Sequence, residues 1–223
     1  MKQLSSLRLL QLASPSLPIG AFAYSQGLES AVQQDYVNNF DTACRWVHDL
    51  LEQALEHLDL PIFLRCYDAW TCQDEERAIY WSAYLIASRE TRELREEERQ
   101  LGQALARILY NLDMTQAGAW RRDSQTSYAA LFALAAVSWD IPQEESAAAF
   151  LWTWLENQVA AAIKLVPLGQ TEGQRILFEV SEKIPACVER ASLKPDSAIG
   201  ASLPGFSILS AQHEIQYSRL FRS

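Results

Sequence analysis

Helical periodicity dominates this sequence and constrains its fold more than any other feature. Apolar residues recur at three- and four-residue intervals along most of the chain, as in the stripe formed by Leu101, Leu105, Ile108 and Leu112. This spacing places a stripe on one face of a helix that packs against a core, whereas the alternation of a half-buried strand is nearly absent. We therefore expect an all-α fold, a bundle of roughly eight to ten helices with no sheet.

The length of 223 residues and the hydrophobic content of 49% suit one helical domain with a sizeable core. No internal repeat and no linker divides the chain. We expect a single domain over residues 1–223. Within it, a segment rich in Pro, Ser and Gly predicts a mobile loop at about 194–207, followed by a tail at 208–223.

Breaks and caps place the expected helices along the chain. They cover residues 4–14, 22–33, 41–58, 59–70, 75–112 as one element or two, 127–139, 140–166, and 171 onward with a start or kink at 185. Asp41 is the expected N-cap of the third helix. Asp140 with Gln143, and Thr171 with Gln174, have the spacing of a capping box that opens the helix after each.

Residues 88–100 alternate in charge in the middle of the chain. Arg92 with Glu96 and Arg95 with Glu98 are complementary pairs at four- and three-residue spacing. This pattern is typical of a solvated helix face. We also expect no pair of carboxylates that stands isolated in an apolar setting, where a raised pKa would follow.

The formal net charge of −9 argues against binding to nucleic acid or to an anionic membrane surface. The four cysteines form no CxxC pair and are expected to be reduced thiols. The longest apolar stretch, residues 128–139, is too short to cross a bilayer, which requires about 20 residues. We expect a cytoplasmic protein without a nucleic-acid or membrane partner.

Motifs that carry catalysis occur only as incomplete versions. His213-Glu214 begins like HExxH, but Tyr217 stands where the second ligand would be. Residues 23–27, AYSQG, differ from a nucleophile elbow at the first position, and no strand precedes them. Residues 200–205 lack the Lys-Ser/Thr of a phosphate loop. We expect no enzyme; a helical enzyme of unrecognised type would require a deep pocket with convergent titratable groups.

One set of residues has ligand chemistry. Cys44, His48 and Glu52 follow one another at four-residue steps and share a helix face. A thiolate, an imidazole and a carboxylate together can hold a transition metal, and a two-fold dimer would double the ligands. The same residues also fit a buried thiol beside a solvated histidine and carboxylate. An independent nickel carrier that uses these three side chains is therefore the alternative function.

Three segments carry a resemblance to a known family. They are residues 9–29 (LLQLASPSLPIGAFAYSQGLE), residues 167–174 (PLGQTEGQ) and residues 213–223 (HEIQYSRLFRS). Arg89, Glu90, Arg92 and Gly102 add a central helix pattern. In this order, in an acidic helical chain of this length, the set resembles the urease accessory protein UreF family over essentially the whole chain.

The resemblance implies an all-helical cytoplasmic protein that is not catalytic and forms a homodimer. It implies that the chain bridges the accessory protein UreD (also called UreH) and the GTPase UreG in the complex that delivers nickel to the urease apoprotein. The chain would need no cofactor of its own, because nickel and GTP act in this assembly through the partners. The resemblance also implies that the tail becomes ordered in the partner complex.

The three segments supply the expected partner contacts. Phe22 and Tyr24 follow a stiff Pro- and Gly-containing approach, and are either core or interface residues. In the tail, Tyr217, Leu220 and Phe221 provide apolar anchors at three- and four-residue spacing. Arg219 and Arg222 provide hydrogen-bond donors, and this mixture suits a protein interface. The tail could instead pack on its own domain only. The expected contact residues are Phe22, Tyr24, Ser25, Gln26, Glu29, Gln170, Gln174, His213, Glu214, Tyr217, Arg219, Leu220, Phe221 and Arg222.

Overall fold

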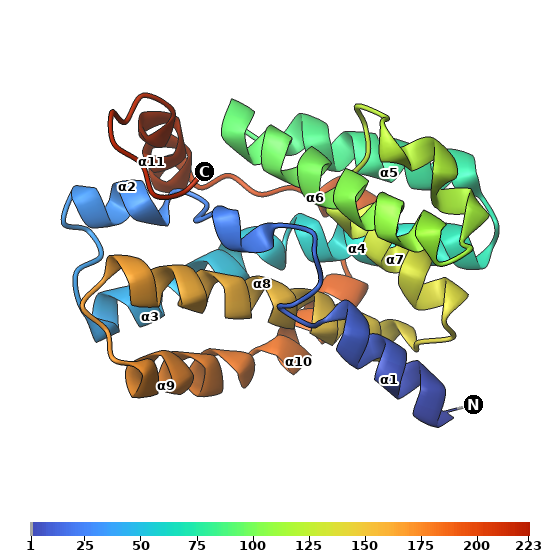
Figure 1. Ribbon diagram of the computed structural model, residues 1–223, viewed down its shortest axis with the longest axis horizontal. Coiled ribbons are helices and arrows are strands. Elements are labelled where there is room, and N and C mark those ends of the chain that lie inside the picture. The colour runs from blue at the N-terminus through green and yellow to red at the C-terminus, as the bar shows by residue number, and fades with distance from the viewer. Residues whose placement is uncertain (1) are drawn as a thin grey trace.

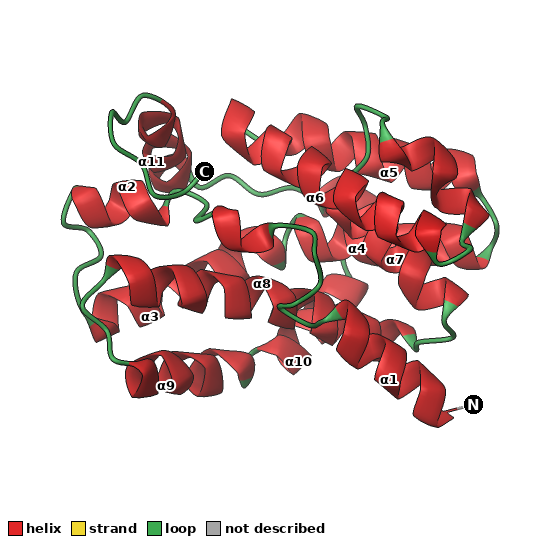
Figure 2. Ribbon diagram, in the orientation of Figure 1, coloured by secondary structure: helices red, strands yellow, loops and turns green. Residues whose placement is uncertain are grey.

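The computed structural model describes residues 2–223 and contains eleven α-helices and no strand within that range. Figures 1 and 2 show helices stacked in layers, with the last helix, α11, beside α2 near the start of the chain. The all-α expectation is confirmed, with one helix more than the upper end of the expected number. The helices are α1 (Lys2–Leu12), α2 (Leu28–Gln33), α3 (Phe40–Leu50), α4 (Asp59–Thr71), α5 (Glu75–Ser88), α6 (Arg92–Asn111), α7 (Tyr128–Ser138), α8 (Gln143–Leu165), α9 (Gln170–Ser181), α10 (Ile184–Ser192) and α11 (Pro204–Glu214).

The core forms around α7, which is buried along most of its length as its apolar run predicts. Phe63 of α4 stacks on Phe150 of α8 at 5.0 Å between ring centroids and meets Phe132 of α7 edge-on at 5.9 Å. Gly102 lets α6 approach the start of α7, because an added Cβ would lie 2.6 Å from the carbonyl carbon of Ser127. Within the described range, no helix combines the length and apolar character that spanning a membrane requires.

Two expected helix starts are wrong, because other residues cap these helices. Asn39, not Asp41, caps α3, since its side chain accepts a hydrogen bond from the Thr42 amide at 3.0 Å. Asp140 adopts a left-handed φ of 52° and its amide donates to Val137, so it ends α7 rather than opening α8.

The expected capping box at Thr171 is also shifted. Helix α9 begins at Gln170, and Glu172 accepts a hydrogen bond from the Gly169 amide at 2.7 Å. The following helix, α10, begins at Ile184 with Pro185 in its first turn, which confirms the expected late start there.

The expected helix over 22–33 is present only from Leu28 onward. Residues 21–23 form a short 3-10 turn, and both Gln26 (φ 51°) and Gly27 (φ 77°) are left-handed. Two successive left-handed residues cannot continue a right-handed helix. Gly27 also passes close to α11, since an added Cβ would lie 3.4 Å from the amide nitrogen of Ser210. The chain therefore turns before α2 and runs beside the C-terminal helix.

Longer predicted elements are divided. The helix expected over 41–58 ends as α3 at Leu50 and continues as a π turn, Leu51–Leu55. The run 75–112 forms two helices, α5 and α6, with Thr91 capping the second. The loop expected at 194–207 ends earlier, because α11 begins at Pro204; its mobility stays a prediction.

Candidate partner-docking site

The segment that precedes α2 meets the C-terminal tail, and the two hydrogen-bond through their backbones. The Ser25 amide donates to the Ser223 carbonyl oxygen at 2.9 Å, and the Arg222 amide donates to the Ala23 oxygen at 2.8 Å. Figure 1 shows the C-terminal mark close to the junction of α2 and α11. Two of the three motif segments, nearly 200 positions apart, thus form one structural unit, which we call the paired ends (residues 20–29 and 213–223).

Glu29 fastens the tail from inside. Its carboxylate accepts the Leu220 amide at 2.7 Å and the Phe221 amide at 2.9 Å, and it lies 3.2 Å from Nε2 of His213. Glu29 is 8% exposed and His213 is fully buried. A carboxylate that takes two consecutive amides orders an otherwise irregular segment without a regular helix or sheet.

Glu93 on α6 holds the other side of the same histidine. Nδ1 of His213 lies 2.7 Å from one Glu93 oxygen, and Nη1 of Arg219 lies 2.5 Å from the other. The expectation of a solvated face over residues 88–100 is therefore wrong on this side of α6. This face of α6 carries the half-buried Glu93 and the buried Glu97 and Glu98, and the paired ends cover part of it.

Glu97 is the most buried of the glutamates on this face of α6, at 4% exposed. Its carboxyl oxygens meet the Ser223 hydroxyl at 2.7 Å and the Gln26 side-chain nitrogen at 2.8 Å. Burial raises the pKa of Glu97 to about 7, although the hydrogen bonds from Ser223 and Gln26 oppose the rise. The sequence prediction concerned isolated pairs of carboxylates, whereas this raised pKa belongs to a single carboxylate that a segment distant in sequence covers.

A second buried group lies behind Glu97. The Arg89 guanidinium binds Asp59 of α4 and, at 2.7 Å, Glu98 of α6. Burial lowers the pKa of Arg89, but the charges of Asp59 and Glu98 outweigh this and raise it above its ordinary value. Glu98 also accepts the Tyr128 amide at 2.8 Å, at the N-terminus of α7. This ion cluster joins α4, α6 and α7.

A cavity of about 160 Å³ separates these acidic groups from the loop that follows α1. Its polar wall contains Asp59, Arg89, Glu97 and Glu98, and its apolar wall includes residues of the 12–22 segment. The convergent titratable groups that a helical enzyme would require are thus present. Three of the four, however, are engaged with one another in the ion cluster.

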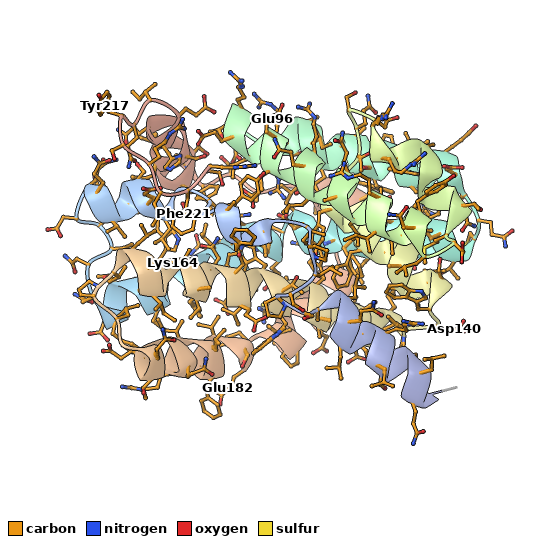
Figure 3. All side chains as sticks on the ribbon, viewed as in Figure 1. Glu96, Asp140, Lys164, Glu182, Tyr217 and Phe221 are labelled. Carbon is orange, nitrogen blue, oxygen red and sulfur yellow. The ribbon has the colours of Figure 1, made fainter. Side chains whose placement is uncertain are left out.

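The paired ends carry three large apolar side chains that are exposed. Phe22, Tyr217 and Leu220 are 70%, 105% and 66% exposed, the last two within the tail. Figure 3 shows Tyr217 projecting from the molecule, whereas Phe221 points inward. Phe221 is buried, and Nζ of Lys164 lies 5.6 Å from its ring centroid. We call the three exposed side chains the outer patch.

The predicted contact residues therefore divide by position. Buried members stabilise the fold of the isolated chain, and the exposed ones are free to meet another surface; their partner contacts stay predictions. Buried are Tyr24, Ser25, Glu29, His213 and Phe221; half-buried are Gln26 and Glu214; exposed are Phe22, Gln170, Gln174, Tyr217, Arg219, Leu220 and Arg222.

Sequence reasoning missed several groups that build this site, namely Glu93, Glu97, Ser223, Trp154 and Gln158. Trp154 of α8 donates its indole N–H to the Gln26 side-chain oxygen at 2.7 Å. Ser223 lies at the end of a recognised segment but has no apolar character that would predict burial. For Glu97 a signal existed, because it lies three residues after Leu94 and four before Leu101, both apolar and buried.

The candidate metal row is not assembled. The Cys44 thiol lies 3.8 Å from Glu179 of α9, while Nε2 of His48 lies 3.5 Å from Glu52. Burial, followed by the charge of Glu179, raises the pKa of Cys44, which disfavours the thiolate that a metal needs. Among residues 2–223 no three such side chains gather where they could hold a metal ion. The alternative of a nickel carrier therefore has no assembled three-ligand group among the described residues of this chain.

Comparison with known proteins decides the family. The sequence model of the UreF family matches residues 37–181 of this chain. The chain is 49% identical to the urease accessory protein UreF of Alkalilimnicola ehrlichii, over 99% of this chain and 96% of that protein. The chain belongs to the UreF family. It is accordingly an accessory protein of urease maturation and not an enzyme.

Further UreF relatives match equally completely. The UreF of Hahella chejuensis is 43% identical over the full length of both chains. That of Alcanivorax borkumensis is 45% identical over 97% of each. The matches extend beyond the region of the family's sequence model to both ends of the chain. The paired ends therefore lie within the part that these UreF proteins share.

Proposed function

We propose that this chain is a co-chaperone that bridges UreD/UreH and the GTPase UreG in the assembly that delivers nickel to the urease apoprotein. It works as a homodimer in the cytoplasm, with nickel and GTP handled by its partners. Membership of the UreF family supports the setting. The observation that carries the proposal is the outer patch, which is apolar, exposed and built on ordered backbone.

Exposed apolar side chains that gather on an ordered surface segment are candidates for a protein interface. Tyr, Trp and Arg anchors supply much of the binding energy of protein interfaces, and Leu does so less often. Here Phe22, Tyr217 and Leu220 project from segments that Glu29 and Glu97 already hold by hydrogen bonds. Docking therefore pays little additional conformational entropy for ordering the backbone. Two exposed arginines, Arg219 and Arg222, flank the patch and can donate to a partner's carbonyl or carboxylate groups.

The test is co-purification of the chain with UreD/UreH and UreG. A Phe22→Ala/Tyr217→Ala/Leu220→Ala variant removes the outer patch without touching the buried face. We expect its recovery with the partners to fall by at least tenfold, because interface anchors are each worth about 2 kcal/mol.

The matched control is Tyr80→Ala, which removes a 57% exposed ring from α5, a helix far from the paired ends in Figure 1. We expect this variant to assemble like the unmodified chain. Normal assembly of the triple variant would contradict the proposal. Circular dichroism of both variants shows whether the helices are intact.

A further inference from the structure

Three carboxylates hold the tail, and one of them differs in its partners. Glu29 and Glu93 both face His213, and Glu93 also faces Arg219. Glu97 instead meets only neutral donors at hydrogen-bond distance, the Ser223 hydroxyl and the Gln26 amide. It is 4% exposed. A buried carboxylate without a paired cation is stable only when its charge is suppressed.

The surroundings of Glu97 contain few charges that could compensate it. Glu98, the next residue on α6, raises the pKa of Glu97. Arg89, just before α6, lowers it, although its guanidinium already binds Asp59 and Glu98. From the tail, Nη1 of Arg222 donates to the side-chain oxygen of Gln100 at 3.4 Å rather than to Glu97.

The remaining elements around Glu97 add two further groups. The N-terminal segment brings the Tyr24 hydroxyl, which also binds Gln100, at 2.6 Å. From α8, Glu156 lines the same cavity. None of these side chains forms an ion pair with Glu97 in the described part of the chain.

We propose that Glu97 is a pH-dependent latch, which fastens residues 222–223 to residues 23–26 when its carboxyl is protonated and loosens them when it is ionised. The geometry makes this carboxyl one contact between the two segments, because one oxygen accepts from Ser223 and the other from Gln26. Ser223 also accepts the Ser25 amide at its carbonyl oxygen and the Gln26 amide at its hydroxyl. Ionisation would loosen the closed form because it places a charge in a buried site, and not because these two hydrogen bonds of the carboxyl are lost. The inference deepens the proposed function, since the latch would regulate the surface that carries the outer patch.

The direction of the effect follows from the position of Glu97. With the ends paired, burial raises the pKa of Glu97 to about 7, against an ordinary value of 4.5. Once the tail is released, water reaches the carboxyl and its pKa falls towards the ordinary value. A raised pKa in the closed state means that closure is most stable at low pH and weakens as pH rises towards and through 7. Between pH 6 and pH 8 the ratio of closed to open tail should fall about tenfold.

Amide hydrogen exchange of the full chain alone measures this ratio. The Ser25 and Arg222 amides report directly, because each donates across the paired ends. After correction for the intrinsic dependence of exchange on pH, we expect their protection factors to be about tenfold lower at pH 8 than at pH 6. Amides in α7 serve as an internal reference for global opening.

Two variants assign the effect. Glu97→Gln keeps a neutral side chain of the same shape and should make protection independent of pH. Glu96→Gln, which removes the neighbouring half-exposed carboxylate labelled in Figure 3, should keep the tenfold change.

Protection that does not change with pH in the unmodified chain would overturn the latch. An undiminished change in Glu97→Gln would overturn it too, and would point to His213, between Glu29 and Glu93. Because no partner is present, failure here is distinct from failure of the docking proposal.

Discussion

Two rows of polar side chains on different helices look alike in the sequence and differ in the structure. Cys44, His48 and Glu52 recur at four-residue spacing, and so do Glu93 and Glu97 on α6. The first row has ligand chemistry but lies half-exposed, and its thiol pairs with Glu179 instead. The second resembles a solvated charge run but is covered by the paired ends. Spacing shows which side chains share a face, whereas the segment that packs on the face decides what they do.

The largest change in stability is expected when the buried ion cluster behind Glu97 loses its cation. Arg89→Ala leaves Asp59 and Glu98 buried without their cation. We expect a loss of about 3–5 kcal/mol in the free energy of unfolding, measured by urea denaturation, because an uncompensated buried charge is costly. Arg175→Ala, which removes an exposed i,i+4 partner of Glu179, is the control and should stay within about 0.5 kcal/mol.

Glu29→Ala tests whether the tail depends on its carboxylate. The change leaves the Leu220 and Phe221 amides without an acceptor. We expect a loss of about 2–3 kcal/mol and accelerated exchange of these two amides. Glu29→Gln, which keeps one acceptor oxygen, should lie between. Unchanged exchange of both amides in Glu29→Ala would show that the tail is held by other contacts.

Glu97 should make the free energy of unfolding depend on pH near neutrality. Since its pKa is raised to about 7, ionisation should reduce the free energy of unfolding by about 2 kcal/mol between pH 5 and pH 8. Glu97→Gln should lack this contribution, so the two stability curves should converge at low pH and separate as pH rises. Thermal unfolding over this range measures the difference. Parallel curves would contradict the raised pKa.

The smallest effects are expected in the other row. Cys44→Ala/His48→Ala should leave nickel binding unchanged in calorimetric titration, because the described residues form no three-ligand group. His48→Ala alone should change stability by no more than about 0.5 kcal/mol, since the side chain is 34% exposed. A nickel isotherm that weakens in the double variant would restore the metal interpretation of this row.

Much of the fold follows from periodicity and punctuation in the sequence. The buried helix at 128–138 and the start of α10 near Pro185 were predictable, because an apolar run and a proline act locally. Asp140 was misassigned because its role depends on the left-handed turn that ends α7. The segment 22–27 was misassigned because Gly27 packs closely against α11, which lies far away in sequence.

The site was predictable in its segments but not in its inner face. The family resemblance identified residues 9–29 and 213–223, which the structure joins. Nothing local distinguishes the buried Glu97 from the half-exposed Glu96, apart from the apolar Leu94 and Leu101 on the same side of α6 as Glu97. Burial of a carboxylate depends on the covering segment, here Ser223 and Gln26, and long-range contacts of this kind leave no periodic signal.

The most direct test of the docking account is hydrogen exchange of the full chain, measured alone and in complex with UreD/UreH and UreG at one pH. The account predicts additional protection at residues 20–27 and 215–222 in the complex. It predicts no comparable change around Cys44, His48 and Glu52. New protection confined to α3, with the paired ends exchanging as they do in the free chain, would contradict it.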